Sequence, residues 1–226
     1  IFFILFHFSW CKSVAIGNVY STSGFVQIVS DDKDVPPNMA INGRTIFSDD
    51  IIRTAKDSYC KIIYNDRTTL VIIDPSTEIK LSDAQLSRNI HLNFGSIYLK
   101  NSRGNRKKSF IFTKSSQIKL KPVELWMDVS EDGGDEIHII KNDLEIFNLN
   151  KKSSLNAKSG MAIYSYKDGF FESIESSFDQ LPSYLVNSQL SSYKLNEAIK
   201  TIYNFVWKDL FKARQEPHCF GHPGTI

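Results

Sequence analysis

The sequence predicts a mainly β protein: an antiparallel or solenoid-like β roll or sandwich of many short strands, with one long C-terminal α-helix. Three observations lead to this fold class. Short runs of alternating apolar and polar residues recur from Ile16 to Gly169. Turn-forming residues separate these runs. From about Asn187 to Arg214 the apolar spacing changes to three and four residues, which is the period of an α-helix.

Each alternating run predicts a strand with one buried and one wet face. The runs are Gly17–Tyr20, Gly24–Val29, Lys61–Tyr64, Thr69–Ile73, Glu78–Leu81, His91–Leu99, Phe110–Phe112, Gln117–Lys121, Glu124–Val129, Glu136–Ile140, Leu144–Asn148 and Met161–Tyr166. Turns are predicted at Asp31-Asp32, Asn42-Gly43, Asn101–Gly104, Asp132–Gly134 and Lys167–Gly169.

The stretch CKIIYNDRTTLVIIDPSTEIKL, residues 60–81, illustrates the pattern. It predicts a hairpin that turns at residues 65–67. Pro75 has no N–H to donate, so we expect it to end the second strand. Cys60 lies on the same strand face as Ile62 and Tyr64, and we expect it to be a small core residue.

The first 15 residues are predicted to be a signal-peptide-like segment with a truncated start. Ile1–Trp10 is almost wholly apolar, too short for a membrane span, and fits the apolar region of a secretory signal. Ser13–Ala15 would be the cleavage site. A buried strand or helix end, and a longer membrane anchor, are the alternatives. With export, we expect a periplasmic or secreted protein that has no stable membrane span once mature.

The domain organisation follows from these shifts in pattern. We expect the β domain at residues 16–169, a connector at 170–186, an amphipathic helix at 187–214 and an irregular tail at 215–226. The helix has an apolar stripe too wide to leave in water, so it is expected to pack on the β domain or to dock a partner. The stripe consists of Leu195, Ile199, Ile202, Val206 and Leu210.

The composition and the absence of known motifs exclude several classes of function but do not identify one. The net charge of +2 argues against nucleic acid as the main partner. No nucleophile elbow, phosphate-binding loop or HExxH zinc motif occurs in the sequence. We therefore expect a non-enzymatic protein without cofactor, metal or catalytic residues. The three cysteines, Cys11, Cys60 and Cys219, form no metal-binding or disulfide-dense pattern.

Four clusters of side chains are candidate sites. The acidic residues around Gly133-Gly134 could be calcium ligands, but a solvated hairpin tip is the simpler interpretation. The basic residues around Gly104 could meet an anionic surface, or could be a wet loop. An aromatic row on the helix could dock a partner or pack at home. The cluster members are Asp128, Glu131, Asp132, Asp135 and Glu136; Lys100, Arg103, Arg106, Lys107 and Lys108; Tyr203, Trp207 and Phe211; and, as a metal set without a fourth ligand, His218, Cys219 and His222.

The order of motifs over residues 16–169 resembles the FecR-like domain, the family named for a ferric-citrate regulator. The resemblance rests on INGRTIFSDDIIRTAKDSYCKIIYNDRTTLVIIDPSTEIKL, HLNFGSIYLK with Gly95, FIFTKSSQIKLKPVELWMDV, IIKNDLEIFN and AKSGMAIYSYKDG. Two positions depart from the family pattern. Pro122-Val123 replaces a Gly-Thr pair, and Arg67 replaces a hairpin glycine. The Arg67 turn must avoid a positive φ or tolerate it at a cost of about 1 kcal/mol.

The resemblance implies an exported, non-enzymatic binding and signalling module of the bacterial envelope, which senses or binds a protein or surface ligand through its β domain. The alternative is a structural or scaffolding envelope protein whose C-terminal helix mediates oligomer or partner contact. Expected partners are an envelope protein or a second copy bound through that helix, and an anionic surface ligand. The partner-binding candidates are Tyr203, Trp207, Phe211, Arg103, Arg106, Lys107 and Lys108.

Overall fold

The computed structural model describes residues 14–30, 36–102, 107–177 and 181–185. The chain divides into two compact units, Ile1–Ser176 and Ser177–Ile226. The first contains all 17 strands found among the described residues. In the second, the described residues include one short helical turn at residues 183–185. The predicted helix at 187–214 and tail at 215–226 lie outside the described residues, as does the apolar segment 1–13.

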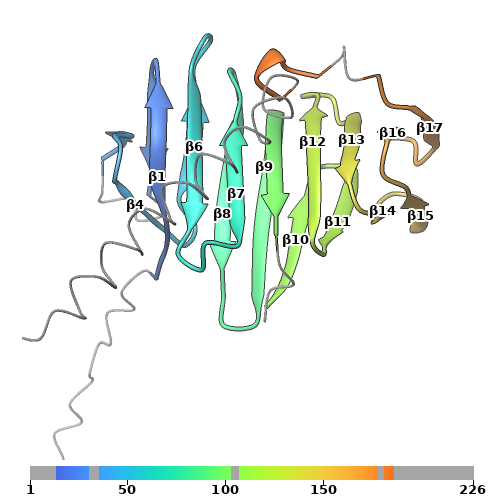
Figure 1. The fold of residues 1–226 in the computed structure, drawn as a ribbon, viewed down its shortest axis with the longest axis horizontal. Helices are drawn as coiled ribbons and strands as arrows, with labels where there is room; N and C mark the ends of the chain where they lie inside the picture. The colour runs from blue at the N-terminus through green and yellow to red at the C-terminus, as the bar shows by residue number, and fades with distance from the viewer. Residues whose placement is uncertain (1–13, 31–35, 103–106, 178–180, 186–226) are drawn as a thin grey trace, which may run out of the picture. The chain divides into compact units, whose positions relative to one another are not determined.

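Two β-sheets make up the first unit, and strands β7, β9 and β12 lie side by side in Figure 1. The order in sheet A is β4 (Thr45–Phe47), β1 (Ala15–Ser23), β6 (Tyr59–Tyr64), β7 (Thr69–Ile73), β9 (Ser87–Asn101), β12 (Val123–Val129), β13 (Asp135–Lys141), β16 (Met161–Ser165) and β17 (Phe171–Glu175). The order in sheet B is β3 (Asn38–Met39), β2 (Val26–Val29), β5 (Ile51–Thr54), β8 (Glu78–Asp83), β9, β10 (Lys108–Phe112), β11 (Ser116–Leu120), β14 (Leu144–Asn148) and β15 (Ser153–Ala157).

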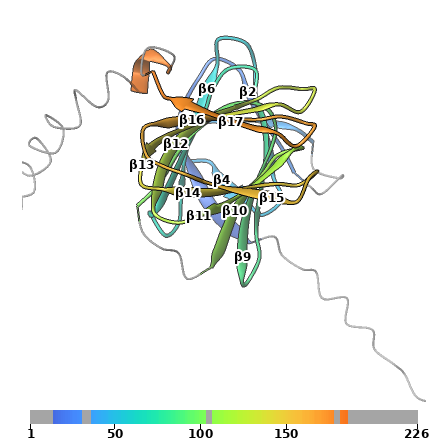
Figure 2. The same ribbon diagram turned by 90° about the vertical axis from the view of Figure 1, so that its right-hand side faces the viewer.

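Strand β9 belongs to both sheets. Its first half pairs with β8 and β10 in sheet B, and its second half pairs with β7 and β12 in sheet A. The strand changes sheet at Gly95, which has a φ of 86°. All pairings among the described strands are antiparallel except β9 with β10. The two sheets face one another as layers, as seen along the sheet edges in Figure 2.

Alternate residues of both sheets point into one shared hydrophobic core. Isoleucine is prominent because β-branched side chains pack well on a pleated surface. In sheet B, one cross-strand ladder joins Ile90, Ile111, Ile118, Ile146 and Leu155. In sheet A, another joins Cys60, Ile73, Ile97, Met127, Ile137 and Ile163. Nearly all of these side chains are fully buried.

The mainly β prediction is confirmed, and every predicted alternating run lies within or overlaps a strand. Pro75 follows the end of β7, and Cys60 is buried. Arg67 adopts a φ of 55°, so the hairpin tolerates the left-handed conformation. Five strands were not predicted. These are β3, β4, β5, β15 and β17.

Strand β17 lies inside the predicted connector, so the β unit continues past Gly169 to Ser176. Its sequence, FESIE, is too polar to resemble a core-facing strand, and four of its five residues are exposed. It is a strand because it forms the antiparallel edge of sheet A beside β16. Pairing with β16 gives the β17 backbone its hydrogen bonds, although the side chains of β17 do not favour a strand.

Candidate protein-binding surface

The C-terminal end of the β unit presents one edge of each sheet. Among the described residues, β17 pairs only with β16, and β15 pairs only with β14. Figure 2 looks onto this end, with β17 in the upper layer and β15 in the lower. An edge strand offers a row of backbone donors and acceptors to which another chain can pair. This end is therefore a candidate binding surface.

The register identifies which backbone groups of β17 face outward. Tyr166 N–H donates to Phe170 O at 2.9 Å, and Ser176 N–H donates to Gly160 O at 2.8 Å. Because bonded and non-bonded positions alternate in an antiparallel pair, the intervening odd-numbered residues direct their N–H and C=O groups away from β16. These residues are Phe171, Ser173 and Glu175.

Apolar side chains that pack against the hydrophobic core are only partly covered at this end. Leu155, Met161 and Phe171 are only partly buried where they pack against the core. Near the opposite end, Ile28 is 2% exposed and Ile46 is fully buried. In stacked β architectures, the terminal layer needs a cap because it has no neighbour on one side. Within the part of the chain that the structure describes, the C-terminal end thus combines unpaired backbone with accessible apolar side chains.

Charges of opposite sign flank the two edges. Strand β15 is preceded by Lys151-Lys152 and followed by Lys158, whereas β17 carries Glu172 and Glu175. Lys151 Nζ lies 3.4 Å from the ring centroid of Phe170, just before β17. The β15 side is therefore basic and the β17 side acidic.

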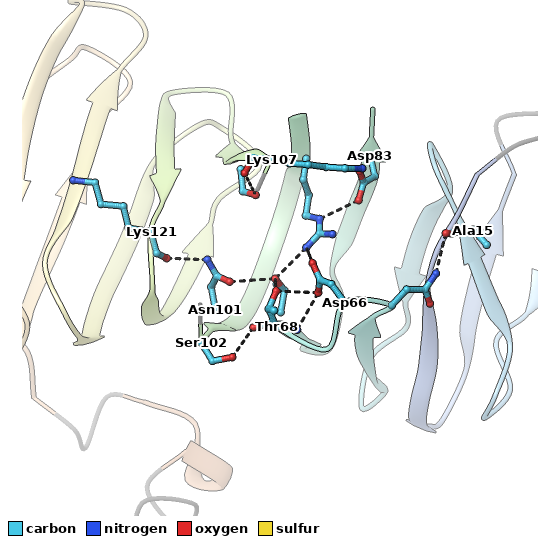
Figure 3. A network of polar contacts seen from close by, with 12 residues as sticks. Ala15, Asp66, Thr68, Asp83, Asn101, Ser102, Lys107 and Lys121 are labelled. Carbon is cyan, nitrogen blue, oxygen red and sulfur yellow. Dashed lines mark hydrogen bonds and ion pairs between the residues drawn. The ribbon is translucent and has the colours of Figure 1, made fainter. Parts of the chain in front are cut away.

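A second polar feature is a buried network around Arg88, shown in Figure 3. The Arg88 guanidinium binds Asp83 at 3.0 Å and Asp66 at 2.9 Å. It also lies 4.0 Å from the ring centroid of Tyr64 and donates to Thr69 Oγ1 at 3.2 Å. These groups come from β6, β7, β8 and the β6–β7 turn, so the network joins sheet A to sheet B.

The pKa of Asp66 reflects this setting. Burial alone would raise it, but hydrogen bonds from Thr68 and the charge of Arg88 outweigh burial and lower it. The network therefore holds Asp66 ionised, and its members are engaged with one another. Its arrangement is that of a support for the fold.

The described members of the predicted basic cluster lie in different settings and do not form one surface. Lys107 binds Asp83 and so joins the Arg88 network, as Figure 3 shows. Lys108 is exposed at the start of β10. Lys100 lies 3.6 Å from Glu124 on the outer face of sheet A. Arg103 and Arg106 lie outside the described residues. The anionic-surface hypothesis thus loses Lys107 as a free charge.

The acidic residues near Gly133-Gly134 have separate roles. Asp128 accepts a hydrogen bond from Ser96, and Asp132 accepts one from Ser130 within the β12–β13 turn. Glu136 binds the ring of His138 at 2.7 Å. Among the described residues, no group of three or more His, Cys, Asp or Glu side chains is placed to hold a metal ion.

Asp135 is the unusual member of this set. It is 3% exposed and accepts a hydrogen bond from Thr113 at 2.7 Å through Oδ2, while Oδ1 has no hydrogen-bond partner among the described residues. The nearby Ser116 hydroxyl donates instead to Ser165 at 2.8 Å. Burial raises the pKa of Asp135 to about 6, and the hydrogen bond from Thr113 offsets this only in part.

The outer face of sheet A carries an aromatic row that the sequence analysis did not identify. The register places Tyr98, Trp126 and His138 next to one another, and the three are at most 8% exposed. Trp126 Nε1 donates to Asp74 Oδ2 at 3.0 Å, and His138 Nδ1 lies 2.6 Å from Ser176 Oγ. Trp126 and His138 lie at positions of their strands that alternate with the buried residues. This alternation in the sequence could have indicated that both side chains are on the outer face.

The structure describes Cys60, but not the aromatic row predicted on the helix. The Cys60 thiol is buried, and burial raises its pKa to about 12, which makes it a core group of low reactivity. Tyr203, Trp207 and Phe211 lie outside the described residues, as do His218, Cys219 and His222. Among the described residues, no helix has the length and hydropathy needed to span a membrane.

Comparison with known proteins identifies the central part of the β unit. The family model of the FecR protein matches residues 50–145. Residues 50–145 are therefore similar to the FecR protein family. This matched range runs from the start of β5 into β14, so it includes the β9 crossing and the Arg88 network. The resemblance inferred over residues 16–169 is thereby confirmed at its centre.

Two solved structures share the fold of this chain. Two crystal structures of a "putative anti-sigma factor" from Parabacteroides distasonis match with TM-scores of 0.52 and 0.50. The identities are 12% and 11%, and the matches cover 62% and 56% of this chain. They cover 64% and 60% of those chains, so this chain spans less than two thirds of either. A search of curated proteins found no match.

Proposed function

We propose that this chain is an exported, non-enzymatic FecR-type module that binds a protein partner through its β unit and takes part in signalling. The observation that carries the proposal is the FecR match over residues 50–145, at the centre of the two-sheet scaffold. The likeness to structures named as anti-sigma factors supports a regulatory role. The accessible edges and apolar side chains at the C-terminal end support binding by surface contact.

The polar groups support binding in preference to catalysis. Arg88, Asp83 and Asp66 join the two sheets, and Trp126 is anchored to Asp74. A catalytic group must present its reactive atom to a substrate. These groups instead direct their polar atoms toward one another, as supports of a binding scaffold do.

Export can be tested with a fusion of the chain to alkaline phosphatase, which becomes active only outside the cytoplasm. The proposal predicts activity for the fusion that carries residues 1–15 behind a start codon. A matched fusion that begins at Ile16 should be inactive. Equal activity of the two fusions, or none in either, would contradict the role of residues 1–15 in export.

Signalling can be tested by deleting residues 15–176 from the gene and measuring transcripts. The proposal predicts that a small, defined set of genes changes expression, and that the intact gene restores it. The alternative scaffolding role predicts a weakened envelope with no such set. Loss of envelope integrity alone would reject the signalling proposal.

A further inference from the structure

The edge strands β15 and β17 run in the same direction. Their starts lie together, because Lys151 Nζ is 3.4 Å from the Phe170 ring and Asn150 Nδ2 donates to Lys167 O at 2.7 Å. Their ends also lie together, because Ser176 N–H donates to Gly160 O, two residues beyond Lys158. The two edges therefore begin at one rim of the unit and finish at the other.

This geometry allows two symmetric ways to join a second copy at this end. A twofold axis along the strands places β17 beside β15 of the partner copy, with both running in the same direction. A twofold axis normal to the sheets places β17 against its own antiparallel copy, and β15 likewise. Both arrangements are closed, so each gives a dimer and no fibre.

Charge distinguishes the two arrangements. With β17 beside β15 of the second copy, the starts of the strands bring Glu172 near Lys152, and the ends bring Glu175 near Lys158. With β17 against itself, the glutamates of both copies meet, and the lysines of both copies meet. Like charges placed opposite one another on paired strands are destabilising. Only the first arrangement is complementary.

The same arrangement would also pair the outward backbone groups of this end and cover its accessible apolar side chains. The outward backbone groups of Phe171, Ser173 and Glu175 would gain partners. The partly buried Phe171 of each copy would meet the Leu155 side of the other, and the apolar layer that includes Met161 would continue across the junction. Exposed ion pairs contribute little energy each, so the charges select the partner strand while backbone pairing and apolar burial supply most of the affinity.

We propose that two copies of this chain associate end to end about a twofold axis, with β17 of each adding to β15 of the other. This contact uses the same C-terminal end that supports partner binding in the proposed function, but it requires neither export nor a signalling partner. It makes the basic edge and the acidic edge of one molecule two halves of one self-complementary surface.

Two charge-reversal variants of the whole chain test the proposal. One is Glu172→Lys with Glu175→Lys, and the other is Lys152→Glu with Lys158→Glu. Sedimentation or light scattering over a wide concentration range gives the mass, and circular dichroism confirms the fold. We expect dimers for the wild type and at least about a tenfold higher dissociation constant for each variant alone.

Mixing the two variants gives the decisive result. In the mixture, β17 of one variant is basic and meets an acidic β15, while the other junction keeps its native charges. Dimers should therefore return to near wild-type affinity. A matched control, Lys119→Glu with Glu145→Lys, exchanges a facing pair of β11 and β14 and should dimerise like the wild type. Ser173→Pro, which removes an outward N–H, should weaken association even if the charge variants misfold.

Several results would overturn the proposal. A wild type that stays monomeric at the highest concentration would do so, and would indicate that this end is covered in another way. Variants that dimerise as well as the wild type would place the contact elsewhere. A mixture that fails to dimerise would reject the pairing of β17 with β15. A mass that grows without limit would indicate head-to-tail stacking.

Discussion

Asp135 is the residue at which the cost of burying charge is most evident. Its carboxyl group is 3% exposed, and burial raises its pKa to about 6 from an ordinary value of 3.8. The folded state therefore keeps this proton at pH values where the unfolded state has lost it. The contribution to stability is complete below about pH 4 and is lost as the pH rises through 6.

We expect Asp135→Asn to remove this dependence. At about 1.4 kcal/mol for each pH unit between the two pKa values, the wild type should lose roughly 3 kcal/mol more stability than the variant between pH 4 and pH 7. Urea unfolding of both proteins across this range measures the difference. Parallel stability curves for the two proteins would show that Asp135 is not buried as described.

Arg88 tests the buried network. Replacing it by methionine leaves Asp66 and Asp83 without their guanidinium partner between the sheets. We expect a loss of about 3 kcal/mol, because Asp83 stays buried with Lys107 as its remaining cation and the more exposed Asp66 loses its ion pair. The control is Arg53→Met, which breaks an ion pair with Glu78 at 2.6 Å in which Arg53 is 49% exposed. It should cost less than about 1 kcal/mol. Equal losses in urea unfolding would contradict the assigned role of Arg88.

At the scale of the element, β9 determines how the two sheets are connected. It changes sheet at Gly95, where a Cβ atom would lie 2.7 Å from Ser76 O and from Thr77 Cα. The φ of 86° at the same position is also costly for any residue with a side chain. Gly95 is thus required for both space and conformation.

We expect Gly95→Ala to destabilise the protein by roughly 3 kcal/mol or more, because backbone atoms must move to admit the methyl group. Gly43 is the matched control. It has a φ of 83°, but an added Cβ would meet no atom within 4 Å. Gly43→Ala should cost only about 1 kcal/mol. A thermal melt in which the two variants behave alike would show that the crossing is not tightly packed.

Strands that lie between clear turns were predictable from their apolar runs. Leu144–Asn148 and Thr69–Ile73 have the predicted bounds, and in each the more buried and less buried residues alternate. The short strand β4 and the polar strand β17 were not predictable, because pairing rather than side-chain pattern makes them strands. The change of sheet within β9 was also beyond local sequence, since Gly95 alone cannot specify two partners.

The same limit applies to the site. Lys107 was predicted as part of a basic surface, but its contact with Asp83 depends on a neighbour 24 residues away. The candidate surface at the C-terminal end arises from β15 and β17, two strands that the sequence did not predict. Sequence periodicity identifies buried faces well, whereas edges are a property of the assembled sheets.

At the scale of the whole β unit, the two sheets share one core, and β9 is common to both. When one sheet unfolds, the strands of the other sheet therefore lose the side chains against which they pack. The Arg88 network adds polar ties between the sheets. We expect residues 15–176 to unfold as one cooperative unit, including strands on both sides of the matched FecR range.

Hydrogen exchange measured by mass spectrometry tests this claim most directly. The account predicts that buried amides of β5 in sheet B, β13 in sheet A and β9 exchange through one common opening, with the same denaturant dependence. Separate transitions for sheet A and sheet B, or for strands before and after β9, would contradict a single scaffold built around that strand.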